Sequence, residues 1–298
     1  MGVNPMSNRN KGILFIILSA FGFAMMSAFV KLSGDLPSLQ KTFFRNLISF
    51  IIAFGMIIYH KESFFGKREN QKLLLTRSIF GTLGVILNFY AIDHLILSDA
   101  NMLNKLSPFF VILFSAIFLK ETLKTKHVAI IGIAFLGALL IIKPAFSLDV
   151  IPYLIGFISA IFAAAAYTCI RAIGRNEKYY TIVFYFSCFS VITIFPLMLI
   201  VYTPMTGIQL LYLILAGVFA TIGQFSITLA YKFAPAKEIS IFDYSNIIFS
   251  AIISMIIFNQ VPDIWSALGY VVIFSASLYM FMYNKNLDKL NMLENNAK

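Results

Sequence analysis

Charged side chains are scarce in this chain. Only 12% of its 298 residues are Asp, Glu, Lys or Arg, whereas a soluble domain is usually about a quarter charged. Its two cysteines, Cys169 and Cys188, both lie within apolar segments, so no disulfide framework is expected. The sequence also lacks a Walker loop, a dinucleotide fingerprint and any Cys/His metal spacing. We therefore expect no water-exposed globular domain, no cofactor and no metal site.

Histidine is equally sparse, with three residues. His60 and His127 lie in or beside basic loops, and His94 follows Asp93 in a turn on the opposite side. Asp93 and His94 could be mistaken for a catalytic pair, but adjacent residues on a helix do not face each other. The sequence predicts no catalytic residue and no enzyme.

Long apolar runs are abundant, and 60% of the residues are hydrophobic. Runs of about 20 residues, the length that crosses about 30 Å of hydrocarbon, recur from end to end. Barrel strands would alternate over about ten residues instead. The sequence therefore predicts an all-α integral membrane protein with ten transmembrane helices in a lipid bilayer. The expected spans are residues 12–32, 40–59, 73–92, 98–118, 126–143, 152–172, 179–201, 208–231, 239–258 and 264–283.

Basic residues gather in alternate connections between these spans. Most of the 23 Lys and Arg residues fall within residues 9–11, 61–72, 120–126, 171–178, 232–237 and 285–298. Short loops rich in Lys and Arg stay cytoplasmic, so both termini are expected on the cytoplasmic side of the cell membrane. The net charge of +10 is then a topology signal, and no nucleic-acid partner is expected.

One block of the chain occurs twice. Gly12–Gly34 aligns with Pro152–Gly174, which pairs Ser19 with Ser159 and Ala24 with Ala164. Each copy holds an odd number of spans, so the second must insert upside down. Such inverted repeats are the architecture of many secondary transporters. The expected organisation is a first five-helix repeat at 11–145, a second, inverted repeat at 150–284, and a cytoplasmic tail at 285–298.

Two segments carry a family resemblance. One runs from Asn88-Phe-Tyr-Ala-Ile through Leu106-Ser-Pro-Phe-Phe to Phe118-Leu-Lys-Glu-Thr-Leu; the other joins Phe258-Asn-Gln-Val-Pro-Asp to Leu268-Gly-Tyr-Val-Val-Ile. With Arg45, they make residues 11–284 resemble the EamA-like branch of the drug/metabolite transporter (DMT) superfamily. The resemblance implies a secondary carrier for small metabolites, often an exporter of amino acids or related compounds.

The two copies depart from that family pattern to different degrees. Pro108 and Glu121 stand in the first copy where the pattern has them, but Asn246 and Gln260 stand at the corresponding places of the second. A hinge at Pro108, with its proline kink, is therefore expected in the first copy alone.

Lys105 is the clearest candidate for substrate binding. It shares one helical face with Asn101, Asn104 and Pro108, and a charge inside a bilayer costs about 2.5–3.5 kcal/mol on insertion scales. Lys105 would anchor a carboxylate or phosphate, with Asn101 and Asn104 as orienting donors. The alternative is a lysine that snorkels to the outer interface.

Asp243 is the repeat mate of Lys105 and lies beside Tyr244 and Asn246. Opposite charges at equivalent positions of inverted helices could face one cavity and bind a substrate with both an amine and a carboxylate. Asp243 could instead be a proton-coupling site, because a desolvated carboxylate titrates nearer neutrality. A third interpretation is an interfacial aspartate that caps a helix.

Three further basic residues lie near span ends. Arg45 could bind a carboxylate or phosphate bidentately, or could bond backbone carbonyls at a helix end. Lys41 is expected to reach the outer interface, and Arg77 is expected to snorkel to the cytoplasmic one.

Neutral candidates complete the predicted site. Asn88 and Gln224 occupy matching regions of the two copies and could line the cavity or bond a neighbouring helix. Tyr167 could supply an aromatic wall.

Together these features predict a secondary-active transporter that works by alternating access. The expected substrate is a small molecule, namely an amino acid or a related carboxylate or zwitterion. Cationic or drug-like substrates, export against import, proton coupling, and a monomer against a homodimer all stay open. A channel or a lipid scramblase is the alternative function.

Overall fold

The computed structural model describes residues 8–120, 123–143, 148–174, 176–233 and 240–296. Within these residues, ten helical segments are long and apolar enough to cross a membrane, which confirms the expected all-α membrane fold. The fourth segment consists of α4 and α5, and the ninth includes α11. The helices are α1 (Asn8–Leu32), α2 (Ser38–His60), α3 (Gln71–His94), α4 (Leu97–Asn104), α5 (Ser107–Phe118), α6 (Thr125–Ile142), α7 (Ile151–Ile173), α8 (Tyr179–Ile200), α9 (Gly207–Phe233), α11 (Ser245–Phe258) and α12 (Ile264–Asn296).

Large apolar side chains cover the outside of the helices. Ile58, Phe118 and Ile256 are each more than half exposed. A bilayer accepts such a surface, and backbone groups inside it must be satisfied within the helices themselves. The exposed apolar faces therefore mark the lipid-facing side of a multi-pass membrane protein.

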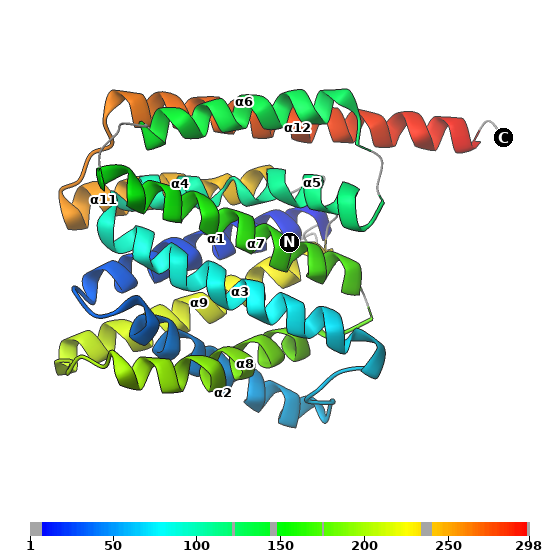
Figure 1. Cartoon of the computed structure of the whole chain (residues 1–298). Coiled ribbons are helices and arrows are strands. Elements are labelled where there is room, and N and C mark those ends of the chain that lie inside the picture. Colours follow the sequence, from blue (N-terminus) through cyan, green and yellow to red (C-terminus); the bar gives the residue numbers. More distant parts are fainter. Residues whose placement is uncertain (1–7, 121–122, 144–147, 175, 234–239, 297–298) are drawn as a thin grey trace, which may run out of the picture.

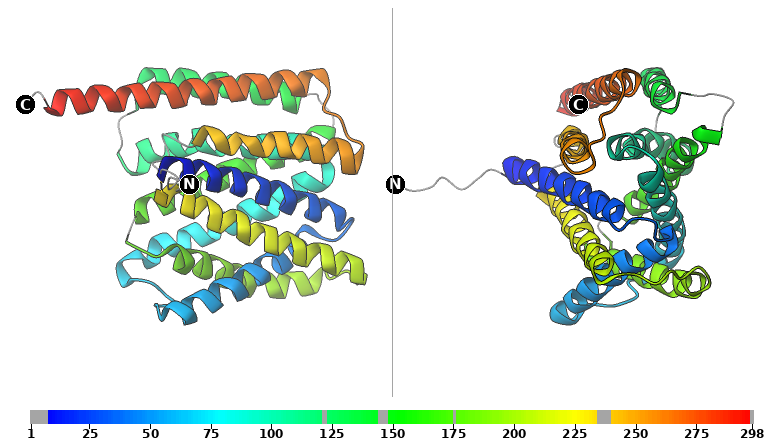
Figure 2. Two further views of the ribbon diagram at one scale, coloured as in Figure 1. Left: turned by 180° about the vertical axis from the view of Figure 1, so that it is seen from behind. Right: turned by 90° about the vertical axis from the view of Figure 1, so that its left-hand side faces the viewer.

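The helices lie in layers with their axes roughly along one direction (Figure 1). α6 and α12 form one outer layer, and α2 and α8 lie together at the opposite side of the molecule. Between them, α1 packs along α9 and α3 packs along α7. Figure 2 shows the same pairs from behind and from one end.

The most extensive contacts between helices have counterparts when every helix is replaced by the equivalent helix of the other sequence block. The α1–α9 contact has its counterpart in α7–α3, the α2–α9 contact in α8–α3, and the α1–α11 contact in α7–α5. The α2–α8 and α6–α12 contacts map onto themselves. The two blocks therefore pack in corresponding ways, and their inverted orientation in the membrane stays a prediction.

Glycines allow two of these contacts to be very close. A Cβ at Gly22 of α1 would lie 2.9 Å from the backbone nitrogen of Gly223 in α9. A Cβ at Gly269 of α12 would lie 2.7 Å from the carbonyl oxygen of Gly137 in α6. Small residues at helix interfaces let the backbones approach, which is a principal source of packing energy inside a membrane.

The connections divide between two ends of the molecule. The ends of α2, α5, α7 and α12 lie on the right in Figure 1, together with the start of α1. We call this the basic end, because the Lys- and Arg-rich connections join helices there. The ends of α1, α3, α6, α8 and α11 lie at the other, far end. α12 continues as a helix to Asn296, where the sequence suggested a polar tail.

Candidate functional site

Both copies interrupt a membrane-spanning helix at the matching place. α4 ends at Asn104 and α5 begins at Ser107, so the regular helix is interrupted at Lys105 and Leu106. In the second copy, a 3-10 segment, η3 (Ser240–Tyr244), ends directly before α11 begins at Ser245. Such a tighter segment inside a spanning helix often marks a functional hinge.

The two interruptions have different local causes. Pro108 lies in the first turn of α5, where its missing N–H removes no helical hydrogen bond. The second copy has no proline there, yet its helix geometry changes at the same place, so an interruption exists there without a proline kink; the hinge at Pro108 stays a prediction. Ser245 Oγ instead donates to the Phe242 carbonyl at 2.7 Å, which offers the backbone an alternative to regular helical bonding.

Lys105 and Asp243 meet at these two interruptions. Lys105 Nζ donates to Asp243 Oδ2 at 2.6 Å. The side chains keep 12% and 16% exposure, respectively, so both remain within reach of water. Asp243 Oδ1 is buried and has no hydrogen-bond partner among the residues that the structure describes. The residues that the sequence paired as repeat mates thus form one ion pair that is only half satisfied.

Tyr244 holds the two interruptions together. Its side chain is buried, and its hydroxyl donates to the Lys105 carbonyl at 3.2 Å. That carbonyl lies where α4 ends, among the backbone groups that a helix end leaves without an intrahelical partner. Tyr244 therefore fixes the Lys105 backbone against the second copy.

The asparagines of the predicted site differ in their bonding. Asn101 accepts from Ser27 Oγ at 3.1 Å and donates to Ser250 Oγ at 2.9 Å, which ties α4 to α1 and α11. Asn246 donates to the Ala20 carbonyl at 2.8 Å. In this conformation both amides act as internal ties. Among the described residues, the Asn104 side chain has no hydrogen-bond partner, so it is the amide of this row that a ligand could engage.

Arg45 and Arg77 form a second cationic centre around Phe186. The Cζ atom of Arg77 lies 3.8 Å from the centre of the Phe186 ring, and that of Arg45 lies 6.0 Å from it. Each arginine is 5% exposed, so the expectation that Arg77 snorkels to the cytoplasmic interface is wrong. Gly81 makes room for this stack, because a Cβ there would lie 3.1 Å both from Arg77 Nη1 and from Phe186.

Arg45 is partly held by neighbouring polar groups. Its Nη1 donates to Asn46 Oδ1, and Asn46 Nδ2 donates to Ser190 Oγ at 2.6 Å. Arg45 Nε, Arg77 Nε and Arg77 Nη1 are buried without a hydrogen-bond partner. Neither arginine bonds a carbonyl at a helix end in the described part of the chain, which removes that alternative for Arg45.

Tyr167 links the two centres. It lies among the central helices and interacts electrostatically with Arg45, Arg77 and Asp243, yet it is 39% exposed. Its electrostatic contacts with all three charged side chains place it between the two centres. This position agrees with the predicted role of Tyr167 as an aromatic wall, which stays a prediction.

Asn88 and Gln224 occupy intermediate positions. Asn88 is partly buried, and its Oδ1 is buried without a hydrogen-bond partner. Gln224 is partly buried and interacts with a neighbouring group. The predicted cavity-lining role of these amides therefore has more structural support at Asn88.

Another Lys–Asp pair lies towards the far end of the molecule. Lys41 is fully buried; its Nζ donates to Asp93 Oδ1 at 2.5 Å and to the Gly34 carbonyl at 2.6 Å. Lys31 Nζ donates nearby to the carbonyls of Ile92 and Leu95. Lys41 thus bonds groups of the far-end connections, and Asp93, 52 residues away in sequence, supplies a partner there that the sequence did not predict; that Lys41 reaches the outer interface stays a prediction.

Asp99 belongs to a further polar cluster near the far end, which the sequence gave no reason to connect. It is fully buried and accepts hydrogen bonds from the hydroxyls of Tyr270 and Ser266. These bonds join α4 to α12. Beyond the spans, Lys143 pairs with Asp263, and hydrogen bonds from Lys143 and from the Ser266 backbone lower the pKa of the Asp263 carboxyl.

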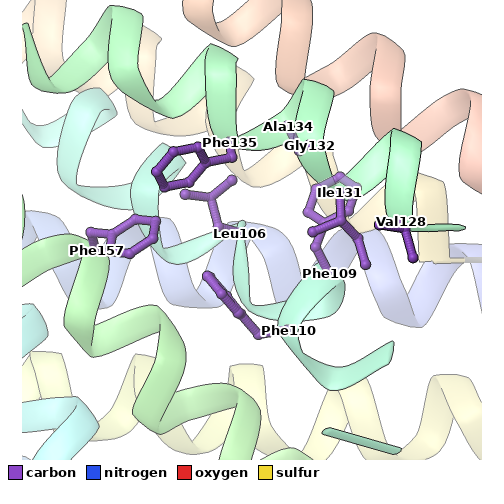
Figure 3. Close-up of a pocket in the computed structure, with 9 residues that line it drawn as sticks. All are labelled: Leu106, Phe109, Phe110, Val128, Ile131, Gly132, Ala134, Phe135 and Phe157. Carbon is purple, nitrogen blue, oxygen red and sulfur yellow. The ribbon is translucent and has the colours of Figure 1, made fainter. Parts of the chain in front are cut away.

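An apolar cavity of about 290 Å³ lies beside the interruption in the first copy. Leu106, Phe109 and Phe110 line it from one side, and Phe135 and Phe157 lie across from them (Figure 3). Its lining has no charged residue, so it does not suit the charged end of a metabolite. The polar site lies instead at the Lys105–Asp243 pair, where the end of α4 meets η3 of the second copy.

Metal ligands are not grouped anywhere in the described part of the chain. Across residues 8–120, 123–143, 148–174, 176–233 and 240–296, three or more His, Cys, Asp or Glu side chains nowhere come together in a way that could hold a metal ion.

Comparison with known proteins identifies the family. The sequence profile of the EamA-like transporter family matches residues 10–143 and again residues 150–282. The chain belongs to the EamA-like transporter family. The resemblance to the drug/metabolite transporter superfamily is thereby confirmed.

Two relatives cover most of this EamA-like chain. The pseudopaline exporter CntI of Pseudomonas aeruginosa (strain UCBPP-PA14) is 34% identical over 270 residues, which cover 90% of this chain and 94% of the exporter. The human protein named solute carrier family 35 member G1 is 26% identical over 283 residues, 90% of this chain and 78% of that protein. Both names describe transport, so the coarse function is membrane transport of a small molecule.

A solved structure supports the fold independently. One crystal structure, titled only as that of a protein, superposes with a TM-score of 0.66 at 15% sequence identity, and the match covers 93% of this chain and 99% of the other. At that identity the likeness concerns the fold alone.

Proposed function

We propose that this protein is a secondary-active transporter that moves a small zwitterionic or carboxylate metabolite by alternating access, with Lys105 and Asp243 at the substrate site. The half-satisfied ion pair between these repeat mates is the observation that carries the proposal. Secondary transporters of inverted-repeat architecture bind substrate where the copies meet, at interrupted helices. We further propose that the protein lies in the cell membrane with its basic end and both termini in the cytoplasm, because basic loops stay there.

The ion pair suits a substrate that carries both an amine and a carboxylate. The substrate carboxylate would replace Asp243 at Lys105, and the substrate amine would replace Lys105 at Asp243. Breaking one pair would then form two, so binding would not leave a buried charge alone. Such a charge is costly when its partner is removed. Asp243 Oδ1 and Asn104 offer further hydrogen-bonding capacity for the incoming molecule.

The empty carrier also benefits from this arrangement. A carrier must reorient without substrate as well as with it, and two separated charges would make the empty form costly. The Lys105–Asp243 bond lets the charges neutralise each other when no substrate is present. The substrate then changes the balance between conformations only through its different contacts in each.

Polar ties near the far end support closure on that side. Lys41–Asp93 joins α2 to α3, and Asp99–Tyr270 joins α4 to α12. Gln209 Nε2 donates to the Ser33 carbonyl at 3.1 Å, which joins α9 to the connection that follows α1. Opening of the far end would need some of these bonds to break. The exporter named among the relatives supports movement outward, from the basic end to the far end.

Proton coupling at Asp243 is the second candidate role. Protonation would remove the carboxylate charge and release Lys105, and the buried Oδ1 would gain a proton to donate. Lys105, Tyr244 and Tyr167 are the groups that bear on this carboxylate. A pH-dependent transport rate that becomes flat in Asp243→Asn, while transport itself persists, would identify this role.

Transport kinetics in proteoliposomes test the proposal. The substrate is first sought by thermal shift of the purified protein against zwitterions, carboxylates and phosphates. A carrier gives saturable uptake that is accelerated by substrate on the opposite side, and Lys105→Ala and Asp243→Ala should each lower it at least 100-fold with normal membrane insertion. Lys143→Ala, at another Lys–Asp pair, is the matched control. Linear, non-saturating flux would instead support a channel or scramblase.

A further inference from the structure

The arginine centre differs from the three lysines that lie inside the described helix bundle, Lys31, Lys41 and Lys105. Lys41 and Lys105 each face an aspartate, and Lys31 donates to two carbonyls. Arg45 and Arg77 have no carboxylate partner, and no Asp or Glu is among the groups that interact electrostatically with either guanidinium. Buried charges in proteins are usually paired, so this centre lacks an anion.

The guanidinium groups meet deep inside the membrane-spanning body. Arg45 is seven residues from the start of α2 at the far end, about 10 Å along the helix axis. Arg77 is six residues from the start of α3 at the basic end, about 9 Å along its axis. Both side chains reach the ring of Phe186 from these opposite directions. A lipid headgroup at either interface is therefore a poor fit to the missing anion.

The free donors of this centre point to an anionic group with several oxygens. Arg45 Nε, Arg77 Nε and Arg77 Nη1 are buried without partners. The Nη2 atoms make no hydrogen bond within the described structure and are absent from the fully buried unpartnered groups, so they retain some access. Guanidinium forks match carboxylate and phosphate oxygens, and stacking on an aromatic ring leaves the edge of the fork free to bind.

Charge balance defines the ligand further. Lys105, Arg45 and Arg77 bring three positive charges to the space around Tyr167, and Asp243 brings one negative charge. A ligand that reduces this excess carries at least two acidic groups and a net negative charge. One acidic group would suit Lys105, and the other would suit the arginine centre.

We propose that Arg45 and Arg77, stacked on Phe186, form an anion subsite that binds a second acidic group of the transported molecule, either a carboxylate or a phosphate. The identification of this ligand as the substrate rests on the proposed transport function. The subsite restricts the substrate to molecules with at least two acidic groups. It also assigns a substrate-binding role to Arg77, which the sequence had placed at the membrane surface.

Matched ligands test the subsite directly. Glutamate and glutamine differ by one carboxylate, and phosphoserine and serine differ by one phosphate. The full-length protein, in nanodiscs of phosphatidylcholine alone, is titrated with all four while its thermal unfolding is followed. At least one doubly acidic ligand should stabilise the wild type with an affinity at least tenfold higher than that of its partner. Equal responses within both ligand pairs would overturn the subsite.

Substitutions separate this subsite from the Lys105–Asp243 site. Arg77→Gln should abolish the preference for the doubly acidic ligand, and Arg77→Lys should restore part of it. Arg68→Gln, at an exposed arginine just before α3, is the matched control and should behave like the wild type. An unchanged preference in Arg77→Gln would overturn the proposal. Lys105→Gln should weaken both members of a pair alike, so an unaffected Lys105 variant would count against the proposed function and leave the subsite intact.

Two further measurements distinguish a ligand-binding arginine from a structural one and from a lipid-binding one. If Arg77 were only structural, Arg77→Gln would lower the unfolding temperature of the ligand-free protein. Because Arg77 has no anionic partner, we expect the unfolding temperature of Arg77→Gln without ligand to equal or exceed that of the wild type. Nanodiscs that contain phosphatidylglycerol test the lipid source of the anion. If that lipid stabilises the wild type, fails to stabilise Arg77→Gln and abolishes the response to glutamate or phosphoserine, the anion is a headgroup and the substrate assignment is wrong.

Discussion

This transporter has two internal Lys–Asp pairs, Lys41–Asp93 and Lys105–Asp243, which have the same chemistry and different surroundings. Lys41 is fully buried, Asp93 is 17% exposed, and Lys41 Nζ bonds both Asp93 and the Gly34 carbonyl. Lys105 bonds Asp243 alone, both side chains keep some exposure, and Asp243 Oδ1 lacks a partner. The first pair is satisfied and joins neighbouring helices of one copy. The second is incomplete and joins the two copies.

The difference teaches what each pair is suited to do. Breaking a satisfied buried pair leaves a charge in an apolar environment, which costs about 3–5 kcal/mol. A pair with spare bonding capacity and access to water can exchange its partners for those of a ligand. We therefore assign structure to Lys41–Asp93 and exchange with substrate to Lys105–Asp243.

Removal of one partner from the satisfied pair should have the largest effect on stability. Lys41→Met should destabilise the protein by up to about 3–5 kcal/mol, the cost of leaving a buried charge unpaired, because the partly buried Asp93 loses its cationic partner. Denaturant unfolding of the purified protein measures this. The double variant Lys41→Met/Asp93→Leu should recover most of the loss, since an apolar pair of similar volume is often tolerated. Wild-type stability in the single variant would break the comparison.

The asparagines of α4 offer the same contrast with a smaller effect. Asn101 is bonded to Ser27 and Ser250, so Asn101→Ala should cost about 1–3 kcal/mol by leaving buried hydroxyls without their partner. Asn104 has no side-chain partner in the described structure, so Asn104→Ala should leave stability within about 0.5 kcal/mol of the wild type and weaken substrate binding. Thermal unfolding with and without substrate compares them. Equal destabilisation by both would contradict the distinction.

The exposed pair Lys143–Asp263 should have the smallest effect. Pairs in solvent contribute about 0–1 kcal/mol, so Asp263→Asn should barely change unfolding at neutral pH. The pKa of Asp263 is lowered in the folded protein by Lys143. Its contribution is therefore present above the ordinary carboxyl pKa of 3.8 and is lost as the pH falls through the lowered value. A pH series of unfolding temperatures should show the small difference between the wild type and Asp263→Asn above pH 3.8 and its loss in strongly acidic solution.

The sequence was sufficient to predict the ten spans and the family. Apolar length and charge alternation follow from the bilayer itself and can be read without knowing any contact. The duplicated block also placed Lys105 and Asp243 at equivalent positions, and the structure brings them together. Their role in substrate binding remains a prediction.

Side-chain direction was the part that the sequence could not predict. The depth of Lys41 and Arg77 along their helices suggested that both reach an interface, but depth does not tell which side of the helix faces the interior. Lys41 turns towards Asp93, and Arg77 turns towards Phe186. Both partners lie far away in sequence, so their contacts exist only after the helices have packed. The second helix interruption was missed because it has no proline.

Counterflow transport by the neutral double variant Lys105→Met/Asp243→Leu tests the central claim most directly. This variant removes both charges together, so no unpaired buried charge remains to unfold the protein. We predict an unfolding temperature within a few degrees of the wild type and no substrate counterflow in proteoliposomes. Counterflow at the wild-type rate in that folded variant would show that the pair is only a tie between the two copies, and it would contradict the account.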